Sequence, residues 1–164
     1  MNNLLILFTD GSVNPQSKIG YGACLAVTDI NLSIDSMKDQ VYIKRFEDTS
    51  STKLELQTLL WALGDIQTTG RKVMVYTDSQ NILGLPTRRE RLEKNDYHSK
   101  KHKRLKHFEL YQAFYSVIDQ LDCELVKVRG HQAANQKDDM DRLFTLVDRA
   151  SRKALRAEGE QSGY

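Results

Sequence analysis

Residues 4–27 read LLILFTDGSVNPQSKIGYGACLAV, and this stretch decides the fold. An apolar run from Leu4 to Thr9 ends in Asp10-Gly11, and a second apolar run follows the turn at Asn14-Pro15. Apolar runs of this length, separated by Asn, Pro and Gly, are typical of paired β-strands. We therefore predict a β-hairpin with Asp10 at the carboxyl end of its first strand.

The rest of the chain alternates between strand and helix patterns. The predicted elements are strands at 4–9, 20–27 and 40–46, a helix from Thr52, a strand at 72–77, a short helix at 81–85 ended by Pro86, a helix at 108–121, a strand at 123–128 and a helix at about 138–157. A strand, crossover helix and strand in succession make the first and fourth strands parallel. The sequence thus predicts an α/β fold with a five-stranded mixed sheet, in which strands 1–3 form an antiparallel meander, flanked by helices.

Length and composition describe a globular protein. The chain has 164 residues, 40% hydrophobic and 28% charged, which predicts one domain over residues 1–158 and a short polar tail at 159–164. It contains no apolar run near the roughly 20 residues that a membrane span needs. The apolar run at 4–8 lacks the basic flank of a secretion signal. Cys24 and Cys123 have no metal-ligand spacing, so we expect reduced thiols and a cytoplasmic protein.

Positive charge is concentrated in one segment. Residues 88–107 hold nine Lys or Arg and three Asp or Glu, although the whole chain carries only +2. Such a run is most often a solvated loop, but it is also the pattern of a nucleic-acid contact. We interpret residues 88–107 as a basic insertion that protrudes from the domain.

Asp10, Glu55 and Asp78 each have an ordinary structural interpretation. Asp10 suits a turn, Glu55 suits a capping box with Thr52, and Asp78 suits a helix cap. Their joint placement is less ordinary, because two parallel-strand ends and the first turn of the crossover helix meet at one edge of the sheet. Three carboxylates there repel one another unless a cation lies between them. Oxygen ligands favour Mg²⁺ or Mn²⁺.

Five motifs carry a family resemblance: FTDGS at 8–12, GYG at 20–22, TKLELQTLLWAL at 52–63, VYTDSQ at 75–80 and VKVRGH at 126–131. They resemble, in order, the motifs of type I ribonucleases H, and the likeness spans residue 4 to about residue 155. The resemblance implies a ribonuclease H-like fold and an endonuclease that hydrolyses the RNA strand of an RNA/DNA hybrid. It also implies that Asp10, Glu55 and Asp78 bind two Mg²⁺ ions, with Mn²⁺ as an alternative.

The fourth carboxylate has two candidates on the last helix. Asp141 and Asp148 are about 10 Å apart along a helix axis, so only one can share ions that lie about 4 Å apart. Met-Asp-Arg-Leu at 140–143 resembles the family's Ala-Asp-x-Leu, ten residues after the loop histidine. The resemblance favours Asp141. Asp148 remains the alternative, with an ion pair to a neighbouring basic residue as its structural interpretation.

His131 follows Gly130 in a predicted polar loop. An isolated loop histidine is most often solvated. Its position resembles that of the family's mobile histidine, which implies a catalytic role in proton transfer around the attacking water or leaving group.

Further residues are implied to contact the substrate. Phosphates of the DNA strand would contact the basic insertion and the N-terminus of the helix predicted from Thr52. The 2′-hydroxyls of the RNA strand would contact polar side chains near the carboxylates. The candidates are Asn14, Ser50, Ser51, Thr52, Gln80, Lys100, Lys101, Lys103 and Arg104.

The chain departs from the family pattern at three places. Gln16-Ser17-Lys18 stands where relatives have glycines, Ser50 to Lys53 stands where they have asparagines, and the basic insertion has no tryptophan. One alternative is therefore a nuclease of different selectivity, and another is a non-catalytic nucleic-acid-binding member of the superfamily. A phosphotransferase is a weaker alternative, because the chain is short and lacks a glycine-rich phosphate loop. We expect a monomer that binds RNA/DNA hybrid and needs no protein partner or membrane.

Overall fold

The computed structural model describes residues 3–28, 33–66, 70–128 and 138–161. Five strands form one sheet in the order β3-β2-β1-β4-β5. Their bounds are Leu4–Asn14 (β1), Ile19–Val27 (β2), Tyr42–Phe46 (β3), Lys72–Thr77 (β4) and Asp122–Lys127 (β5). β1, β2 and β3 pair antiparallel, whereas β1–β4 and β4–β5 pair parallel. The predicted mixed sheet with its antiparallel meander is confirmed.

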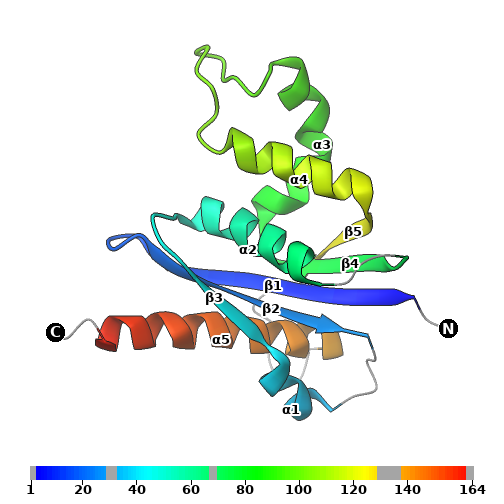
Figure 1. Ribbon diagram of the computed structural model, residues 1–164, viewed down its shortest axis with the longest axis vertical. Helices are drawn as coiled ribbons and strands as arrows, with labels where there is room; N and C mark the ends of the chain where they lie inside the picture. Colours follow the sequence, from blue (N-terminus) through cyan, green and yellow to red (C-terminus); the bar gives the residue numbers. More distant parts are fainter. Residues whose placement is uncertain (1–2, 29–32, 67–69, 129–137, 162–164) are drawn as a thin grey trace.

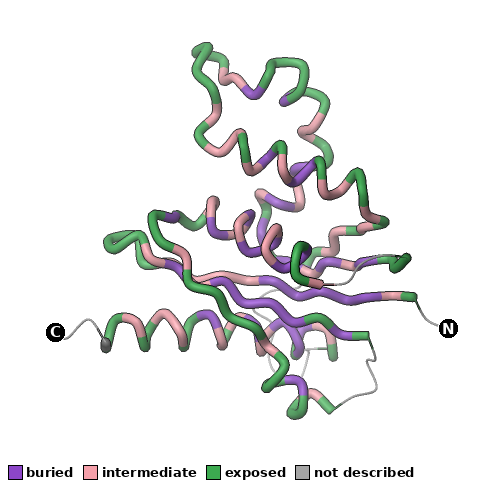
Figure 2. The backbone as a smooth tube through the Cα atoms, in the orientation of Figure 1, coloured by how far each residue is buried: buried purple, intermediate pink, exposed green. Residues whose placement is uncertain are grey.

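Helices cover both faces of this sheet (Figure 1). Helices α2 (Ser51–Asp65), α3 (Gln80–Lys94) and α4 (Phe108–Gln120) lie on one side, and α5 (Asp139–Gln161) lies along β1 and β2 on the other. Alternation along β1 serves both layers, because Leu5 and Leu7 join the core under α2 while Ile6 and Phe8 join the core over α5. Figure 2 shows the buried residues running along the central strands, whereas the loop between α3 and α4 is largely exposed and projects from the sheet.

Helix α3 corrects one prediction. It runs through Pro86 to Lys94 instead of ending at the proline, so it forms the first part of the predicted basic insertion. Proline removes one backbone donor from a helix, but the core can hold the chain in place on either side of it. Leu85 and Leu92 are both buried, and the Tyr115 hydroxyl donates to the Leu85 carbonyl at 2.6 Å. Tertiary packing therefore continues the helix where the local signal predicts a stop.

Smaller differences concern the segment between β2 and β3 and the end of α5. Between β2 and β3 the chain forms a short helix α1 (Ile34–Met37) and a 3₁₀ turn (Lys38–Gln40), which the sequence did not predict. The buried Met37 anchors this segment in the core over α5. Helix α5 continues through residues 159–161 of the predicted polar tail, and residues 162–164 lie outside the described part. Within the described ranges, no helix is both long and apolar enough to cross a membrane.

Candidate active site

Asp10, Glu55 and Asp78 line one small hollow at the edge of the sheet. Asp10 lies inside β1, which continues to Asn14 instead of ending at Thr9 as predicted, although its parallel pairing with β4 ends at Phe8. Asp78 directly follows the parallel strand β4, and Glu55 lies in the second turn of α2. The remaining lining residues are Thr9, Thr58, Thr77, Ser79 and Ile82. The structure thus brings together the three carboxylates that the sequence placed at this edge.

Helix α5 adds a fourth carboxylate from the opposite face of the sheet. The Asp148 side chain lies close enough to Asp10 to raise the pKa of the Asp10 carboxyl group. Asp148 follows Val147, which is fully buried against the sheet, and this packing turns the helix so that Asp148 meets β1. The predicted ion pair of Asp148 is present as well, because Arg152 Nε donates to its Oδ1 at 2.9 Å. Asp148 therefore lies where the sequence interpretation placed Asp141.

Asp141 has a different environment from Asp148. Its backbone N–H donates to Asp138 Oδ1 at 2.8 Å, and its own Oδ2 accepts from the Asp138 N–H at 3.4 Å. This reciprocal pair resembles a capping box at the N-terminus of α5. Only 6% of Asp141 is exposed. In the structure, the aspartate of the Met-Asp-Arg-Leu motif thus takes part in a cap at the start of α5.

Burial and repulsion change the protonation of the site. Burial, followed by the neighbouring charge of Asp78 and the hydrogen bond with Asp148, raises the pKa of Asp10 to about 8. Burial also raises the pKa of Glu55, whereas a hydrogen bond from Ser79 opposes the shift. The Ser79 hydroxyl donates to Glu55 Oε2 at 2.6 Å. Without a cation, Asp10 therefore holds a proton at neutral pH.

The same Ser79 contact shows that Glu55 is not the capping residue predicted from Thr52. The N-cap of α2 is Ser50, whose hydroxyl accepts from the Lys53 N–H at 3.3 Å. Glu55 is one turn further along and directs its carboxylate toward α3 instead. Ser79 also caps α3, because its hydroxyl accepts from the Ile82 N–H at 3.1 Å. One buried hydroxyl thus fixes both a helix start and a site carboxylate.

The donor set fits a hard divalent cation. Four carboxylates from β1, α2, the end of β4 and α5 supply only oxygen atoms. The raised pKa of Asp10 reflects its burial and, after that, the negative charge of Asp78 and Asp148, which a cation would offset. In the described part of the chain, no three Asp, Glu, His or Cys side chains already stand close enough to hold one ion. The residues fit the ion chemically, and the carboxylates must close around it.

The other predicted site residues lie at different distances from this hollow. His131 lies outside the described residues. Asn14 is at the end of β1, where its Oδ1 accepts from the N–H groups of Gln16 and Ser17 and so stabilises the turn. Gln80 is the exposed first residue of α3, next to Ser79.

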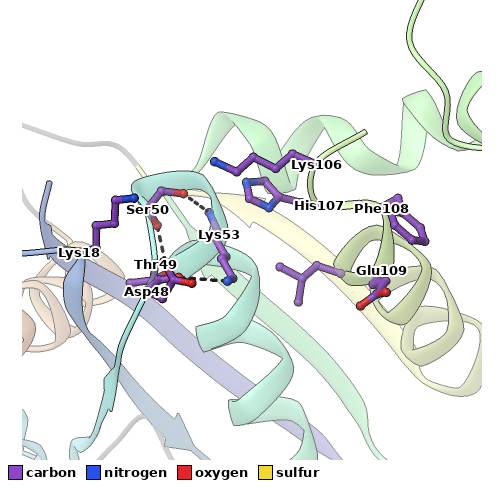
Figure 3. Close-up of a pocket in the computed structure, with 10 residues that line it drawn as sticks. Lys18, Asp48, Thr49, Ser50, Lys53, Lys106, His107, Phe108 and Glu109 are labelled. Carbon is purple, nitrogen blue, oxygen red and sulfur yellow. Dashed lines mark hydrogen bonds between the residues drawn. The ribbon is translucent and has the colours of Figure 1, made fainter. Parts of the chain in front are cut away.

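A second, larger cleft lies beside the N-terminus of α2 (Figure 3). Its volume is about 340 Å³. Figure 3 shows Lys18, Ser50 and Lys53 on one side, facing Lys106 and His107 from the segment that leads into α4. The N-terminus of α2 opens here with its Ser50 cap, and Lys53 Nζ donates to the Asp48 carbonyl at 3.0 Å. The cleft therefore combines three lysines, against the two acidic residues Asp48 and Glu109, with a helix N-terminus, which leaves an excess of positive charge that attracts anions.

The electrostatics of the cleft act on His107. Burial, together with the charges of Lys106 and Lys53, lowers the pKa of His107. The imidazole is therefore largely uncharged at neutral pH, and the lysines carry the positive charge. Of the predicted phosphate contacts, Ser50 lines this cleft, whereas Ser51 and Thr52 are the next two residues of α2.

The remaining predicted residues of the basic insertion line neither hollow. Lys100, Lys101 and Lys103 are exposed in the loop between α3 and α4. Arg104 is held locally, because its guanidinium lies 4.2 Å from the Phe108 ring centroid and 3.6 Å from Asp96. An isolated bridge between His98 and Arg104 closes the loop.

Several residues of the two hollows were not among the sequence candidates. Ser79 was detectable, since it follows Asp78 directly and precedes a helix. Three further residues are close in sequence to predicted candidates, namely Lys53, Lys106 and His107. They come together in the cleft only because α2 packs against α4. Lys18 gave no signal, because it enters the cleft through a turn in which its own φ is 60°.

Comparison with known proteins assigns the family. The sequence matches RNase H over residues 2–149, which is most of the chain. This protein belongs to the RNase H family. Its α/β fold is RNase H-like, as expected from the motif order.

Individual relatives agree with this assignment. A ribonuclease H of Syntrophomonas wolfei subsp. wolfei is 25% identical over 159 residues, which cover 94% of this chain and 98% of that protein. The solution structure of the PFV RNase H domain has a TM-score of 0.67 at 15% identity, covering 92% of each chain. A foamy viral protease–reverse transcriptase in complex with dsDNA has a TM-score of 0.63 at 13% identity, covering 90% of this chain and 92% of that one. The two structures share the fold with this RNase H family member.

Proposed function

We propose that this RNase H family member is a divalent-metal-dependent endonuclease that hydrolyses the RNA strand of RNA/DNA hybrids. The observation that carries the proposal is the convergence of Asp10, Glu55, Asp78 and Asp148 on one edge of the sheet. A protein that only bound nucleic acid would be hindered by four carboxylates beside a phosphodiester. Family membership supports a nuclease acting on such hybrids.

The chain's own residues would prepare the site for Mg²⁺ or Mn²⁺. Two such ions, when bound, would supply positive charge for the attacking and leaving oxygens. Ser79 orients Glu55 through its 2.6 Å hydrogen bond. Asp10 releases the proton that its raised pKa retains in the absence of a cation. His131 remains the candidate for proton transfer near the leaving group.

The substrate would lie across both hollows. The cation-rich cleft at the N-terminus of α2 suits a phosphate of the uncut strand, and the exposed lysines of the basic insertion suit further phosphates. Phosphate contacts position the duplex without reading its bases, so cleavage should depend little on sequence. Gln80 is the better placed of the two 2′-hydroxyl candidates, since Asn14 is already engaged in its own turn.

The central test compares labelled RNA/DNA hybrid, double-stranded RNA and double-stranded DNA, each with Mg²⁺, with Mn²⁺ and with EDTA. We expect cleavage of the RNA strand of the hybrid alone, and only with metal. Equal cleavage of all three duplexes would show a nuclease of different selectivity. Binding of the hybrid without cleavage in either metal would show the non-catalytic alternative and overturn the proposal.

The cleft gives a separate prediction about affinity. Replacing Lys53 by Gln should weaken hybrid binding severalfold and reduce the slope of log affinity against log salt by about 1, because one phosphate contact is lost. Binding is measured in the Asp10→Asn background so that the hybrid stays intact. Lys72→Gln is the matched control, since Lys72 lies at the start of β4 and pairs with Glu124 at 3.4 Å. Equal salt slopes for both variants would exclude the cleft from the phosphate path.

A further inference from the structure

Two serines connect the strand of Asp10 to the helix of Asp148. Ser12 lies two residues after Asp10 on β1, and Ser151 lies three residues after Asp148 on α5. Their hydroxyl oxygens are 3.0 Å apart. Ser151 is fully buried, so its hydroxyl needs partners inside the protein.

The direction of this hydrogen bond follows from the second partner of Ser151. The Ser151 hydroxyl has one hydrogen, and it donates to the Asp148 carbonyl at 3.0 Å. Its oxygen can therefore only accept from Ser12, which donates. The result is a continuous path from β1 through two hydroxyls to the backbone of Asp148.

The core between α5 and the sheet is apolar. Helix α5 packs on β1 and β2 through the buried side chains Ile6, Phe8, Ala23, Leu25, Leu143, Phe144 and Val147. Apolar burial is non-directional, so it holds the helix against the sheet without fixing its position along its own axis. A shift by one residue moves a helix by about 1.5 Å, which is large for a site whose carboxylates must share ions. A directional bond near the site fixes that position.

We propose that Ser12 and Ser151 are positioning residues that set the placement of Asp148 relative to Asp10 for cation binding. This inference rests on the proposed nuclease function. Neither serine touches the substrate or the reacting atoms. Their contribution is the alignment of β1 with α5 at the level of the two carboxylates.

The test measures Mn²⁺ affinity by calorimetry without nucleic acid, beside the Mn²⁺ dependence of cleavage and the urea midpoint of unfolding. Ser151→Ala and Ser12→Ala should each weaken Mn²⁺ binding about threefold to tenfold, the equivalent of one lost hydrogen bond. Cleavage at saturating Mn²⁺ should stay within about twofold of wild type. Ser12→Thr, which keeps the hydroxyl, should bind Mn²⁺ like wild type.

Two controls separate positioning from simple stability. Ser116→Ala replaces an exposed helical serine on α4, far from this path, and should leave Mn²⁺ affinity unchanged. The double variant Ser12→Ala/Ser151→Ala should bind Mn²⁺ no more weakly than Ser151→Ala, because Ser151→Ala already removes the bond to Ser12 together with the bond to the Asp148 carbonyl. Variants with a lower urea midpoint but wild-type Mn²⁺ affinity would overturn the inference. Absence of cleavage by the wild type would instead overturn the proposed function.

Discussion

Replacing Asp148 by Asn should lower the rate of hybrid cleavage by about three orders of magnitude, whereas Asp141→Asn should leave it within severalfold of wild type. The two residues lie seven positions apart on α5, but only Asp148 lies close enough to Asp10 to raise its pKa. An amide retains the shape of the carboxylate and loses the charge that a cation requires. Single-turnover cleavage of a labelled hybrid in saturating Mg²⁺ measures both rates.

We expect the same two variants to rank in the opposite order for folding stability, with Asp141→Asn the more destabilised. Asp141→Asn removes a negative charge from the first turn of α5, which should cost about 0.5 to 1 kcal/mol of folding free energy. Asp148→Asn keeps a side-chain oxygen beside the protonated Asp10 and loses only the surface ion pair with Arg152, so it should change the stability of the metal-free protein little. Urea unfolding in EDTA gives these values. A large loss of activity in Asp141→Asn with activity retained in Asp148→Asn would restore the order suggested by sequence.

The sheet was predictable from sequence because its signals are local. Apolar runs, turn residues and one crossover helix determine the pairing of β1, β2 and β4, and each can be found within about ten residues. The full length of helix α3 was not predictable from sequence, because Pro86 is a local stop signal. The burial of Leu85 and Leu92 continues the helix past this proline. Where packing opposes a local signal, the sequence pattern alone does not reveal which one prevails.

The site also has one part that was predictable from sequence and one part that was not. Asp10, Glu55 and Asp78 follow from the sheet topology, since the parallel pairing of β1 with β4 ends just before Asp10 and Asp78, at the edge where the crossover helix carries Glu55. The choice between Asp141 and Asp148 depends on the rotation of α5, which is set by the contacts of Phe144, Val147 and Ser151 with the sheet. The cleft that holds Lys18, Lys53 and Lys106 depends on how α2 packs against α4. Neither relation has a signature in a short stretch of sequence.

Gly22→Ala should destabilise the protein by about 3 kcal/mol, at the upper end of the range for overpacking. Gly22 lies on β2 opposite Gly11, where α2 approaches the sheet most closely. An added Cβ would lie 2.2 Å from Thr58 Oγ1 and 2.8 Å from Thr58 Cγ2. Thr58 is fully buried in the helix that carries Glu55, so it cannot rotate into solvent. Relief of the clash must move α2, and Glu55 moves with it.

Thr58→Ala in the Gly22→Ala background should recover most of both stability and activity. It removes the two nearest atoms and leaves the Thr58 Cβ position 3.0 Å from the new methyl group, a contact that a small shift relieves. Thr58→Ala alone should be nearly neutral, because its buried hydroxyl makes no hydrogen bond with the described residues. Gly64→Ala is the control on the same helix, since its Cβ would meet nothing within 4 Å and should stabilise α2 by about 0.5 to 1 kcal/mol. Urea unfolding and hybrid cleavage are measured on all four variants. If the double variant were as unstable as Gly22→Ala, the clash with Thr58 would not be what requires glycine at this position.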